Sequence, residues 1–390
     1  GGALRPPFFY AVAKLMTNVV IIGAGQAACQ TAVSLRQGGF NGAINLYGDE
    51  LYLPYERPPL SKAVLTGDQE PERTLLRSEA YYLENKIGMH LGQTITVQNL
   101  PSYDILVLAT GMSPRTLSGF PASKTHVLRT INDAERLRLS VARDTRVLIL
   151  GAGFIGLEAA AALAGKVNEI KVYDLASQVM GRAAAEPIAS SAQIALEAKG
   201  ITFCLQKSVS AEEADSYDLI LIAVGGEAND QLAVELGLCE PGKLKADRNS
   251  LVADNIYAVG DVAIAQHNFL PQPARLESVD QAIYSAKCAA AHILGNELPP
   301  AAAPWFWSFQ GDWKLQMVGI WCSDLRPVFY GGQPGDQSFS VFGFRNDKLI
   351  AAQCVNRPAD FAASRRLVGI DYPNFDQRIQ EEGFKLKMLL

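Results

Sequence analysis

The sequence predicts an α/β protein with two units built on parallel sheets, the second inserted into the first, and a small C-terminal α+β domain. The main evidence is an internal repeat. The segments that begin at Asn18 and Arg146 both contain a buried strand, a tight glycine turn, an alanine-rich helix and a second strand that ends in an acidic residue. Short apolar runs of this kind are typical of parallel strands that are covered on both faces.

Further strands complete the two units. DILVLATG, from Asp104, and DLILIAVGG, from Asp218, are each expected to close one unit. A third such strand, NIYAVGD, ends at Asp261 and follows the second unit, so we expect the chain to return there to the first. The sequence therefore predicts one domain over residues 16–118 and 242–300 and an inserted domain over 119–241.

The pattern changes after Pro299. ELPPAAAPWFWS reads as a linker, and WKLQMVGIWC, FSVFGF and KLIAAQCV alternate as antiparallel strands do, with a turn at Asn346 and Asp347. PADFAASRRLV is expected to form a helix on that sheet, which gives a domain over 301–390. Residues 1–15 precede Met16 and are interpreted as an extension or tag.

Composition limits the class of partner and the compartment. The 390 residues carry a net charge of −5 with no long basic cluster, which argues against nucleic acid and anionic membranes. No apolar run approaches the roughly 18 residues of a membrane span, and no signal peptide is evident, so a cytoplasmic protein is expected. The four histidines lack metal-ligand spacing, so no metal site is predicted.

The six cysteines are far apart and none forms a CxxC pair. This spacing argues against a disulfide framework and against a redox dithiol. All six are expected to be reduced, buried thiols.

The first glycine turn, GxGxxA, contains Gly23, Gly25 and Ala28. Gly23 permits the tight turn, Gly25 allows close approach of a pyrophosphate, and Ala28 keeps helix and strand close. Asp49 follows the second strand and is placed to bind a ribose. A lone motif of this type is weak evidence, but strand, helix and acid in this order predict a dinucleotide site.

The second turn repeats the pattern with Gly151, Gly153 and Gly156, and its acid is Asp174. A carboxylate at the ribose favours a free 2′-hydroxyl, and the following residues, LASQ, include no arginine for a 2′-phosphate. NADH is therefore expected in preference to NADPH.

The segment LPYERPPLSK, from Leu53 to Lys62, contains two adjacent prolines. They stiffen the backbone, so Arg57 and Lys62 would be presented from a rigid loop. A proline-rich surface connection with solvated charges is an equally good interpretation on composition alone.

These segments, with LATGMSPR, IYAVGD, PWFWS and CVNRPADFA, resemble the FAD-dependent NADH:ferredoxin reductases of multicomponent aromatic-ring dioxygenase and cytochrome P450 systems. The phenylpropionate and biphenyl dioxygenase reductase components and putidaredoxin reductase are similar. The resemblance runs from about Asn18 to the C-terminus. It implies a glutathione-reductase-like pair of Rossmann-like domains, with FAD in the first and NADH in the second.

The resemblance also implies roles for single residues. Arg57, Lys62 and Arg115 would contact FAD, and Lys62 would form an ion pair with Glu158 beside the flavin. Trp307 would lie by the isoalloxazine, whereas Trp305 is expected to fill the core. The remaining cofactor residues are Ala109, Thr110, Gly111, Gly225, Gly260 and Asp261, the last at the ribityl chain.

The implied function is NADH:ferredoxin oxidoreductase. NADH would deliver a hydride to FAD, and the lack of a dithiol leaves FAD to pass single electrons to a [2Fe-2S] ferredoxin that feeds an oxygenase. Lys287, Arg365 and Arg366 could form the docking patch, although each alone could be an ordinary solvated charge. The sequence names neither the oxygenase, nor its substrate, nor the ferredoxin type, nor the oligomeric state.

Two alternative functions remain. An NADH oxidase or coenzyme A disulfide reductase would need a redox cysteine where this chain has LPYERPPLSK. An NADH-sensing flavoprotein related to apoptosis-inducing factor would be expected to show an organelle leader and a basic surface.

The chain departs from the family pattern in three places. Trp307, Ser308, Phe309 and Gln310 stand where the family has WSDQ, and Val279 stands where the dioxygenase branch often has tryptophan. The β-meanders expected at 93–103 and 207–217 are short. Either their tips are truly trimmed, or loops that the protein has are missing from the printed sequence at these points. The symmetry of the two shortenings favours the second interpretation.

Overall fold

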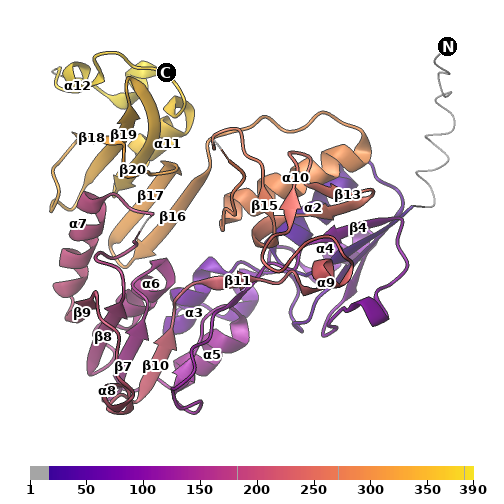
Figure 1. Cartoon of the computed structure of the whole chain (residues 1–390), viewed down its shortest axis with the longest axis horizontal. Helices are drawn as coiled ribbons and strands as arrows, with labels where there is room; N and C mark the ends of the chain where they lie inside the picture. Colours follow the sequence, from indigo (N-terminus) through magenta and orange to yellow (C-terminus); the bar gives the residue numbers. More distant parts are fainter. Residues whose placement is uncertain (1–16, 182, 271, 382) are drawn as a thin grey trace. The chain divides into compact units, whose positions relative to one another are not determined.

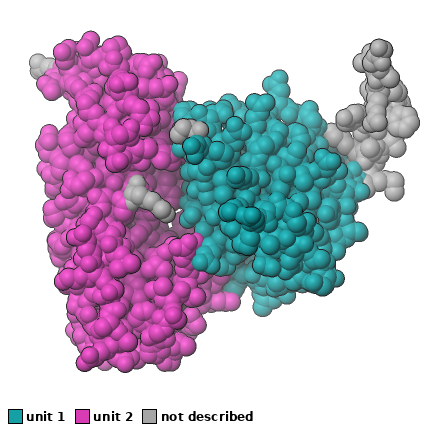
Figure 2. Space-filling model, viewed as in Figure 1, with its two compact units in different colours: residues 1–56, 72–113, 227–301 teal, residues 57–71, 114–226, 302–390 magenta. Residues whose placement is uncertain are grey.

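The computed structural model describes residues 17–181, 183–270, 272–381 and 383–390, so the predicted extension over 1–15 lies outside the described residues. The chain separates into two compact units, which Figure 2 colours separately. Unit 1 contains the chain up to Glu56, Glu72–Ser113 and Glu227–Ala301. Unit 2 contains Arg57–Pro71, Pro114–Gly226 and Ala302–Leu390.

Unit 1 is built on a six-stranded sheet in the order β13-β14-β4-β1-β2-β3. All neighbours are parallel except β13 and β14, which pair antiparallel. The chain returns to this sheet through β14, beside β4, so in sequence the parallel strands of the second unit are inserted between two parts of the first, as predicted. The strands are β1 (Asn18–Ile22), β2 (Ala43–Tyr47), β3 (Ile87–His90), β4 (Ile105–Leu108), β13 (Leu251–Ala253) and β14 (Ile256–Ala258).

Two helices cover one face of this sheet. α2 (Gln26–Gln37) and α10 (Val279–Leu294) pack against each other, and their alanines allow this close contact. Their buried residues form one core with Val19, Ile21 and Val107 of the sheet. The shorter elements of unit 1 are α4 (Glu79–Glu84), α9 (Gln231–Glu235), β12 (Lys245–Ala246), β15 (Ile264–Ala265), η2 (Pro71–Thr74), η3 (Val97–Asn99) and η4 (Gly260–Val262).

Unit 2 contains a five-stranded parallel sheet in the order β6-β10-β7-β8-β9. Its strands are β6 (Thr125–His126), β7 (Arg146–Leu150), β8 (Glu169–Asp174), β9 (Ile201–Leu205) and β10 (Leu219–Ile222), and its helices are α5 (Ile131–Leu139), α6 (Phe154–Leu163), α7 (Glu186–Glu197) and α8 (Ala211–Asp215). The proline-rich segment folds here: η1 (Pro58–Ser61) and α3 (Ala63–Thr66) pack against α5 and α6. This packing assigns residues 57–71 to unit 2, although the predicted first domain included them.

The C-terminal part of unit 2 is an antiparallel sheet in the order β16-β17-β20-β19-β18, drawn from orange to yellow in Figure 1. The predicted strands, the turn at Asn346 and Asp347 and the helix on the sheet are confirmed. The elements are β16 (Trp305–Gln310), β17 (Trp313–Gly319), β18 (Arg326–Tyr330), β19 (Phe339–Arg345), β20 (Lys348–Val355), α11 (Pro358–Leu367), α12 (Phe375–Arg378) and η5 (Leu386–Leu389). Two short strands, β5 (Met112–Pro114) and β11 (Gly226–Ala228), pair with each other in a separate two-stranded sheet.

Three expectations need correction. The linker interpretation of PWFWS was wrong, because Trp305–Gln310 is a strand that pairs along its whole length with β17. The two expected meanders contain no strand: all of their residues are described, and they form η3 and α8 instead. Serine or threonine N-caps explain this. Thr96 caps η3, and the Ser210 side chain accepts from the Glu213 N–H at the start of α8.

The third correction concerns the cysteines. All six thiols are free, but only Cys29, Cys288 and Cys354 are buried, and Cys322 is exposed.

In the part of the chain that is described, no helix combines the length and hydropathy needed to cross a bilayer.

Candidate active site

The first glycine turn lies between β1 and α2 of unit 1. Gly23 has φ +114°, and a Cβ on it would lie 2.2 Å from the Ala109 carbonyl oxygen, so only glycine fits. Gly25, the N-cap of α2, has φ −96°, and a Cβ there would meet no protein atom within 4 Å. The fold itself does not require glycine at position 25. The open space beside a helix N-terminus fits a ligand phosphate.

The second turn repeats this geometry between β7 and α6 of unit 2. Gly151 has φ +108°, and a Cβ would lie 2.3 Å from the Ala223 carbonyl oxygen. Gly153, at φ −79°, again faces open space. Gly156 allows the close approach of helix and strand, because a Cβ there would lie 2.1 Å from the Gly151 carbonyl oxygen. Both turns therefore have the shape that a dinucleotide pyrophosphate needs.

The two predicted ribose acids differ in their surroundings. Asp49 is exposed and follows Gly48, whose added Cβ would lie 2.5 Å from the Ala24 Cβ in the glycine turn. Asp174 is held by two backbone donors: the Ala152 N–H lies 2.7 Å from Oδ2 and the Ala176 N–H 2.7 Å from Oδ1. Each oxygen retains a second lone pair, so the fixed carboxylate can still accept from a ribose hydroxyl.

Other predicted cofactor residues of unit 1 gather around the first turn. The Gly260 N–H donates to Ser285 Oγ of α10 at 3.0 Å, and a Cβ on Gly260 would lie 3.0 Å from the Ala27 Cβ of α2. Asp261 in η4 is thereby placed near the start of α2.

Asn229 holds the ATG segment after β4, and the sequence analysis missed it. The Thr110 hydroxyl donates to the Asn229 carbonyl at 2.6 Å, and the side-chain amide of Asn229 donates to the Thr110 carbonyl at 2.9 Å. The backbone N–H of Asn229 donates to the Gly111 carbonyl at 3.0 Å. Only its position just after the second closing strand could have suggested it.

Unit 2 contains an ion pair with a buried carboxylate. Lys62 Nζ lies 2.5 Å from Glu158 Oε2, which confirms the predicted contact. Ser61 Oγ donates to the same oxygen at 2.5 Å, and Lys62 also donates to the Pro58 carbonyl at 3.0 Å. The Glu158 side chain is 5% exposed and that of Lys62 is 22% exposed. Pro58 and Pro59 begin η1 and restrict its backbone, which fixes the direction of the lysine.

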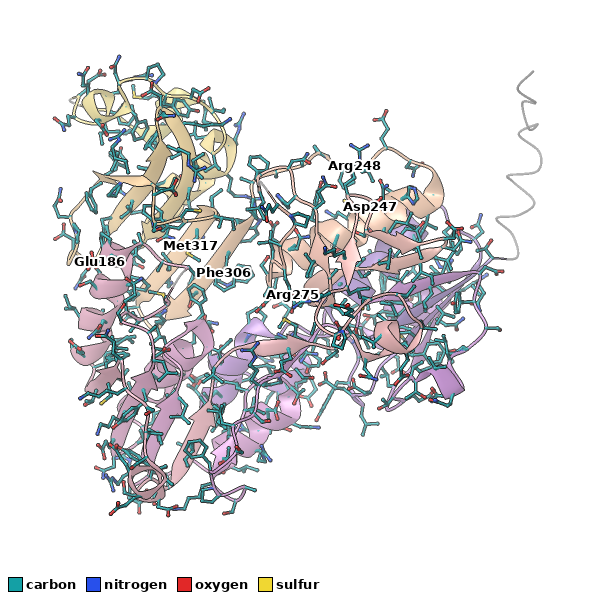
Figure 3. The ribbon with its side chains drawn as sticks, in the orientation of Figure 1. Glu186, Asp247, Arg248, Arg275, Phe306 and Met317 are labelled. Carbon is teal, nitrogen blue, oxygen red and sulfur yellow. The ribbon has the colours of Figure 1, made fainter. Side chains whose placement is uncertain are left out.

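Strand β16 completes the surroundings of Glu158. Ser308 Oγ donates to Glu158 Oε1 at 2.8 Å, and Gln310 Nε2 lies 3.4 Å from Ser308 Oγ. On the same face Phe306, labelled in Figure 3, contacts Phe154 of α6, and the ring centroids of the two side chains are 4.7 Å apart. The position where the family has aspartate, Phe309, belongs to the other face, so the substitution leaves these polar contacts intact. No site role was predicted from the sequence for Ser61, Ser308 or Gln310. For Ser308 and Gln310 a signal was present, because two polar residues at alternate positions of an otherwise apolar strand share one face.

Trp307 lies on the opposite face of β16 from Ser308. Its indole stacks on Trp305 at 5.2 Å, and the Arg365 guanidinium lies 4.9 Å from the Trp305 ring. Trp305 packs on the core of the C-terminal sheet with Phe361.

The other charged residues predicted for the site are Arg57, Arg115, Lys287, Arg365 and Arg366. Arg57 donates to the Arg129 carbonyl at 2.5 Å, whereas the Arg115 side chain is exposed and its N–H donates to the carbonyl of Gly225 at 3.0 Å. Lys287 is exposed on α10 in unit 1, and Arg366 is exposed, like Arg365, on α11 in unit 2.

Four of the six cysteines are unsuited to form an activated thiolate. Burial raises the pKa of Cys288 to about 11 and that of Cys354 to about 12, and it also raises the pKa values of Cys29 and Cys239. Since the thiolate is the reactive form, these four are poor redox nucleophiles.

Comparison with protein families agrees with this geometry. Residues 17–287 match the model described as pyridine nucleotide-disulphide oxidoreductase, and residues 305–390 match the model described as reductase C-terminal. The chain belongs to the pyridine nucleotide-disulphide oxidoreductase family. Proteins of this family use FAD and NAD(H), and both glycine turns fit these cofactors.

Individual members are similar over nearly the whole chain. Rhodocoxin reductase of Rhodococcus erythropolis is 33% identical, covering 96% of this chain and 94% of its own length. The 3-phenylpropionate/cinnamic acid dioxygenase ferredoxin–NAD(+) reductase component of Photorhabdus laumondii is 32% identical, covering 90% and 95%. The solved covalent complex of putidaredoxin reductase with putidaredoxin contains a chain with TM-score 0.88 and 30% identity, covering 96% and 98%.

Proposed function

We propose that the protein is an FAD-dependent NADH:ferredoxin reductase that delivers single electrons to a [2Fe-2S] ferredoxin of an oxygenase system. The observation that carries the proposal is the pair of glycine turns, each open at its second glycine, in a chain whose relatives are named as ferredoxin reductases. The described cysteines form no dithiol, so a bound flavin would take a hydride from NADH and release its electrons directly.

The two turns divide the cofactors. Gly23, Gly25 and Ala28 would hold the FAD pyrophosphate, with Asp49 at its ribose and Asp261 at the ribityl chain. Gly151, Gly153 and Gly156 would hold NADH, with Asp174 at the ribose. Asp174 is already fixed by two backbone donors, so binding a free 2′-hydroxyl requires no reorientation of the carboxylate, whereas a 2′-phosphate would be repelled.

The Lys62–Glu158 pair would act on the flavin ring. The Ser61 and Ser308 hydroxyls donate to the Glu158 carboxylate and fix its position. Lys62 donates to the same carboxylate, so its ammonium is fixed as well. A fixed cation beside a group whose charge changes lowers the cost of that change, because no reorganisation is needed. Arg57 and Arg115 would bind FAD, and Trp307 would contact the isoalloxazine.

Lys287, Arg365 and Arg366 are proposed to attract an acidic ferredoxin. All three side chains are exposed, and Arg365 is anchored over the Trp305 ring. Exposed charges of this kind act mainly on the association rate and lose their effect as salt rises.

The test is ferredoxin-dependent cytochrome c reduction across an ionic-strength series. Lys287→Glu should lower the rate at low salt and flatten its salt dependence, while NADH-to-ferricyanide activity stays unchanged. Lys166→Glu makes the same charge change at another exposed lysine and serves as the control. If Lys287→Glu keeps both the rate and the salt dependence of the wild type, Lys287 is not part of the docking surface. If the wild type reduces ferricyanide but not ferredoxin, the proposed acceptor is wrong.

A further inference from the structure

We propose that Gln353, on β20 of the C-terminal domain, is a positioning residue for NADH: it holds the end of the loop that follows Asp174 and so keeps the second glycine turn in its binding shape. The inference rests on the proposed binding of NADH at this turn. Neither the motifs nor the predicted site residues point to a glutamine some 180 residues further along the chain.

The loop after Asp174 is bonded directly to the glycine turn. Apart from residue 182, which is not described, residues 175–185 form turns and bends between β8 and α7, and α7 begins at Glu186 (Figure 3). The Met180 N–H donates to the Ala152 carbonyl at 2.8 Å, and the Ala152 N–H donates to Asp174 Oδ2 at 2.7 Å. A shift of the loop would therefore move both the peptide between the two turn glycines and the ribose carboxylate.

The loop needs support for this shape beyond two contacts at Met180: the Ala183 N–H donates to the Met180 carbonyl at 3.0 Å, and Gln310 Nε2 lies 3.7 Å from Met180 Sδ. Met180 has φ +54°, a left-handed conformation that is unfavourable for a non-glycine residue. Within the loop, Gln178 Nε2 donates to the Gly181 and Ala184 carbonyls at 2.7 and 3.2 Å. Such a conformation persists only when the surrounding structure fixes it.

Gln353 supplies that support from the C-terminal sheet. Its Nε2 donates to the Ala183 carbonyl at 2.9 Å, and its Oε1 accepts from the Ala185 N–H at 2.9 Å. Both ends of one amide thus bind the last residues of the loop, immediately before α7. Ala185 is completely buried, and Gln353 is 2% exposed, so water cannot replace these bonds easily.

The position of Gln353 on β20 explains why it faces the loop. Ala352 and Cys354, its neighbours in sequence, pack into the core under α11 with Phe361. Because side chains alternate along a strand, Gln353 points to the other face, where its cross-strand partners are Met317 (Figure 3) and Val341. A buried amide beside two apolar side chains is costly unless it is hydrogen-bonded, and the loop is what bonds it.

The experiment compares Gln353→Met with Ser340→Ala. Methionine fills a similar volume but removes both bonds. Ser340 is fully buried on β19 of the same sheet and donates to Asp360 Oδ2 at 2.9 Å. It makes no hydrogen bond to the described residues of the loop, so its replacement should weaken the domain without touching the turn. Both variants are assayed as FAD-loaded full-length protein with ferricyanide as acceptor, and NAD⁺ binding is measured by calorimetry.

Gln353→Met should raise the KM for NADH and the Kd for NAD⁺ about tenfold, which corresponds to about 1.4 kcal/mol. Its kcat should stay within about twofold and its FAD content unchanged. Ser340→Ala should lower the unfolding temperature with no change in KM. The inference is overturned if Gln353→Met binds NAD⁺ as the wild type does, or if Ser340→Ala raises KM equally.

A second variant tests the same inference if Gln353→Met folds poorly. Gln353→Glu retains an acceptor for the Ala185 N–H but can donate to the Ala183 carbonyl only when its carboxyl is protonated. Its KM for NADH should therefore improve as the pH is lowered, relative to that of the wild type. A pH profile parallel to the wild type would contradict the inference, whereas a wild type that NADH does not reduce would refute the proposed function instead.

Discussion

Removal of Lys62 tests the energetic role of the buried ion pair. Glu158 is 5% exposed and would lose the Lys62 ammonium that lies 2.5 Å from its Oε2, while Ser61 and Ser308 would still donate to it. Removing one member of a buried pair costs about 3–5 kcal/mol. Because two hydroxyl donors remain, we expect Lys62→Met to cost about 3 kcal/mol, at the lower end of this range.

Removing the two charges of the pair should cost different amounts of stability. Lys62 is 22% exposed and also donates to the Pro58 carbonyl, so Glu158→Gln leaves an ammonium that can still reach water. That variant should cost only about 1.5 kcal/mol, the loss of one charged hydrogen bond. The double variant should cost clearly less than the sum, because no stranded carboxylate remains.

The assay is urea unfolding followed by circular dichroism, with every variant saturated with FAD at one fixed concentration. Flavin reduction by NADH is measured in parallel by rapid mixing, and we expect both single variants to slow it while retaining their FAD. Strict additivity of the two costs, or a Lys62→Met variant that unfolds like the wild type, would refute this account of the pair.

Three further predictions follow from single contacts. Gly25→Val should abolish FAD binding while leaving the apoprotein's unfolding midpoint nearly unchanged, whereas Gly23→Ala should destabilise the fold itself. The reason is that Gly23, unlike Gly25, has a positive φ and no room for a Cβ. Equal destabilisation of the two apoproteins would contradict the assignment of Gly25 to a phosphate. NADH should reduce the wild type far better than NADPH, and Asp174→Ala should narrow that gap; equal rates in the wild type would argue against the ribose carboxylate. Burial raises the pKa of Cys288 from its ordinary 9.0 to about 11, so the thiol ionises first in the unfolded chain. The contribution of this thiol to stability should therefore be complete below pH 9 and be lost as the pH rises towards 11. Cys288→Ala should reduce the fall in stability over this range, and an identical pH profile would exclude the thiol as its cause.

The repeated pattern allowed much of the architecture to be predicted. Both parallel sheets, the return of the chain through β14 and the antiparallel C-terminal strands follow from apolar periodicity and from glycines whose positions are imposed by φ or by close approach. The ion pair of Lys62 with Glu158 could be predicted only because the segments resemble a known family, since the two residues are 96 positions apart.

The errors have local physical causes. PWFWS was interpreted as a linker because alanines and prolines precede it, but pairing with β17 extends the sheet to Trp305. Residues 207–217 were expected to form strands, and the Ser210 cap with Glu213 favours a helical turn. Contacts such as that of Gln353 with Ala183 and Ala185 depend on the packing of distant elements, which no local pattern encodes.

The central claim is that NADH reduces a bound flavin and that a ferredoxin then reoxidises it. The most direct measurement is anaerobic double mixing: the FAD-loaded protein is first bleached by one equivalent of NADH and then mixed with an oxidised [2Fe-2S] ferredoxin or with oxygenated buffer. We predict that bleaching is fast, that ferredoxin restores the flavin absorbance much faster than oxygen does, and that two ferredoxins are reduced per NADH. A flavin that NADH bleaches but that oxygen reoxidises faster than ferredoxin would contradict the account.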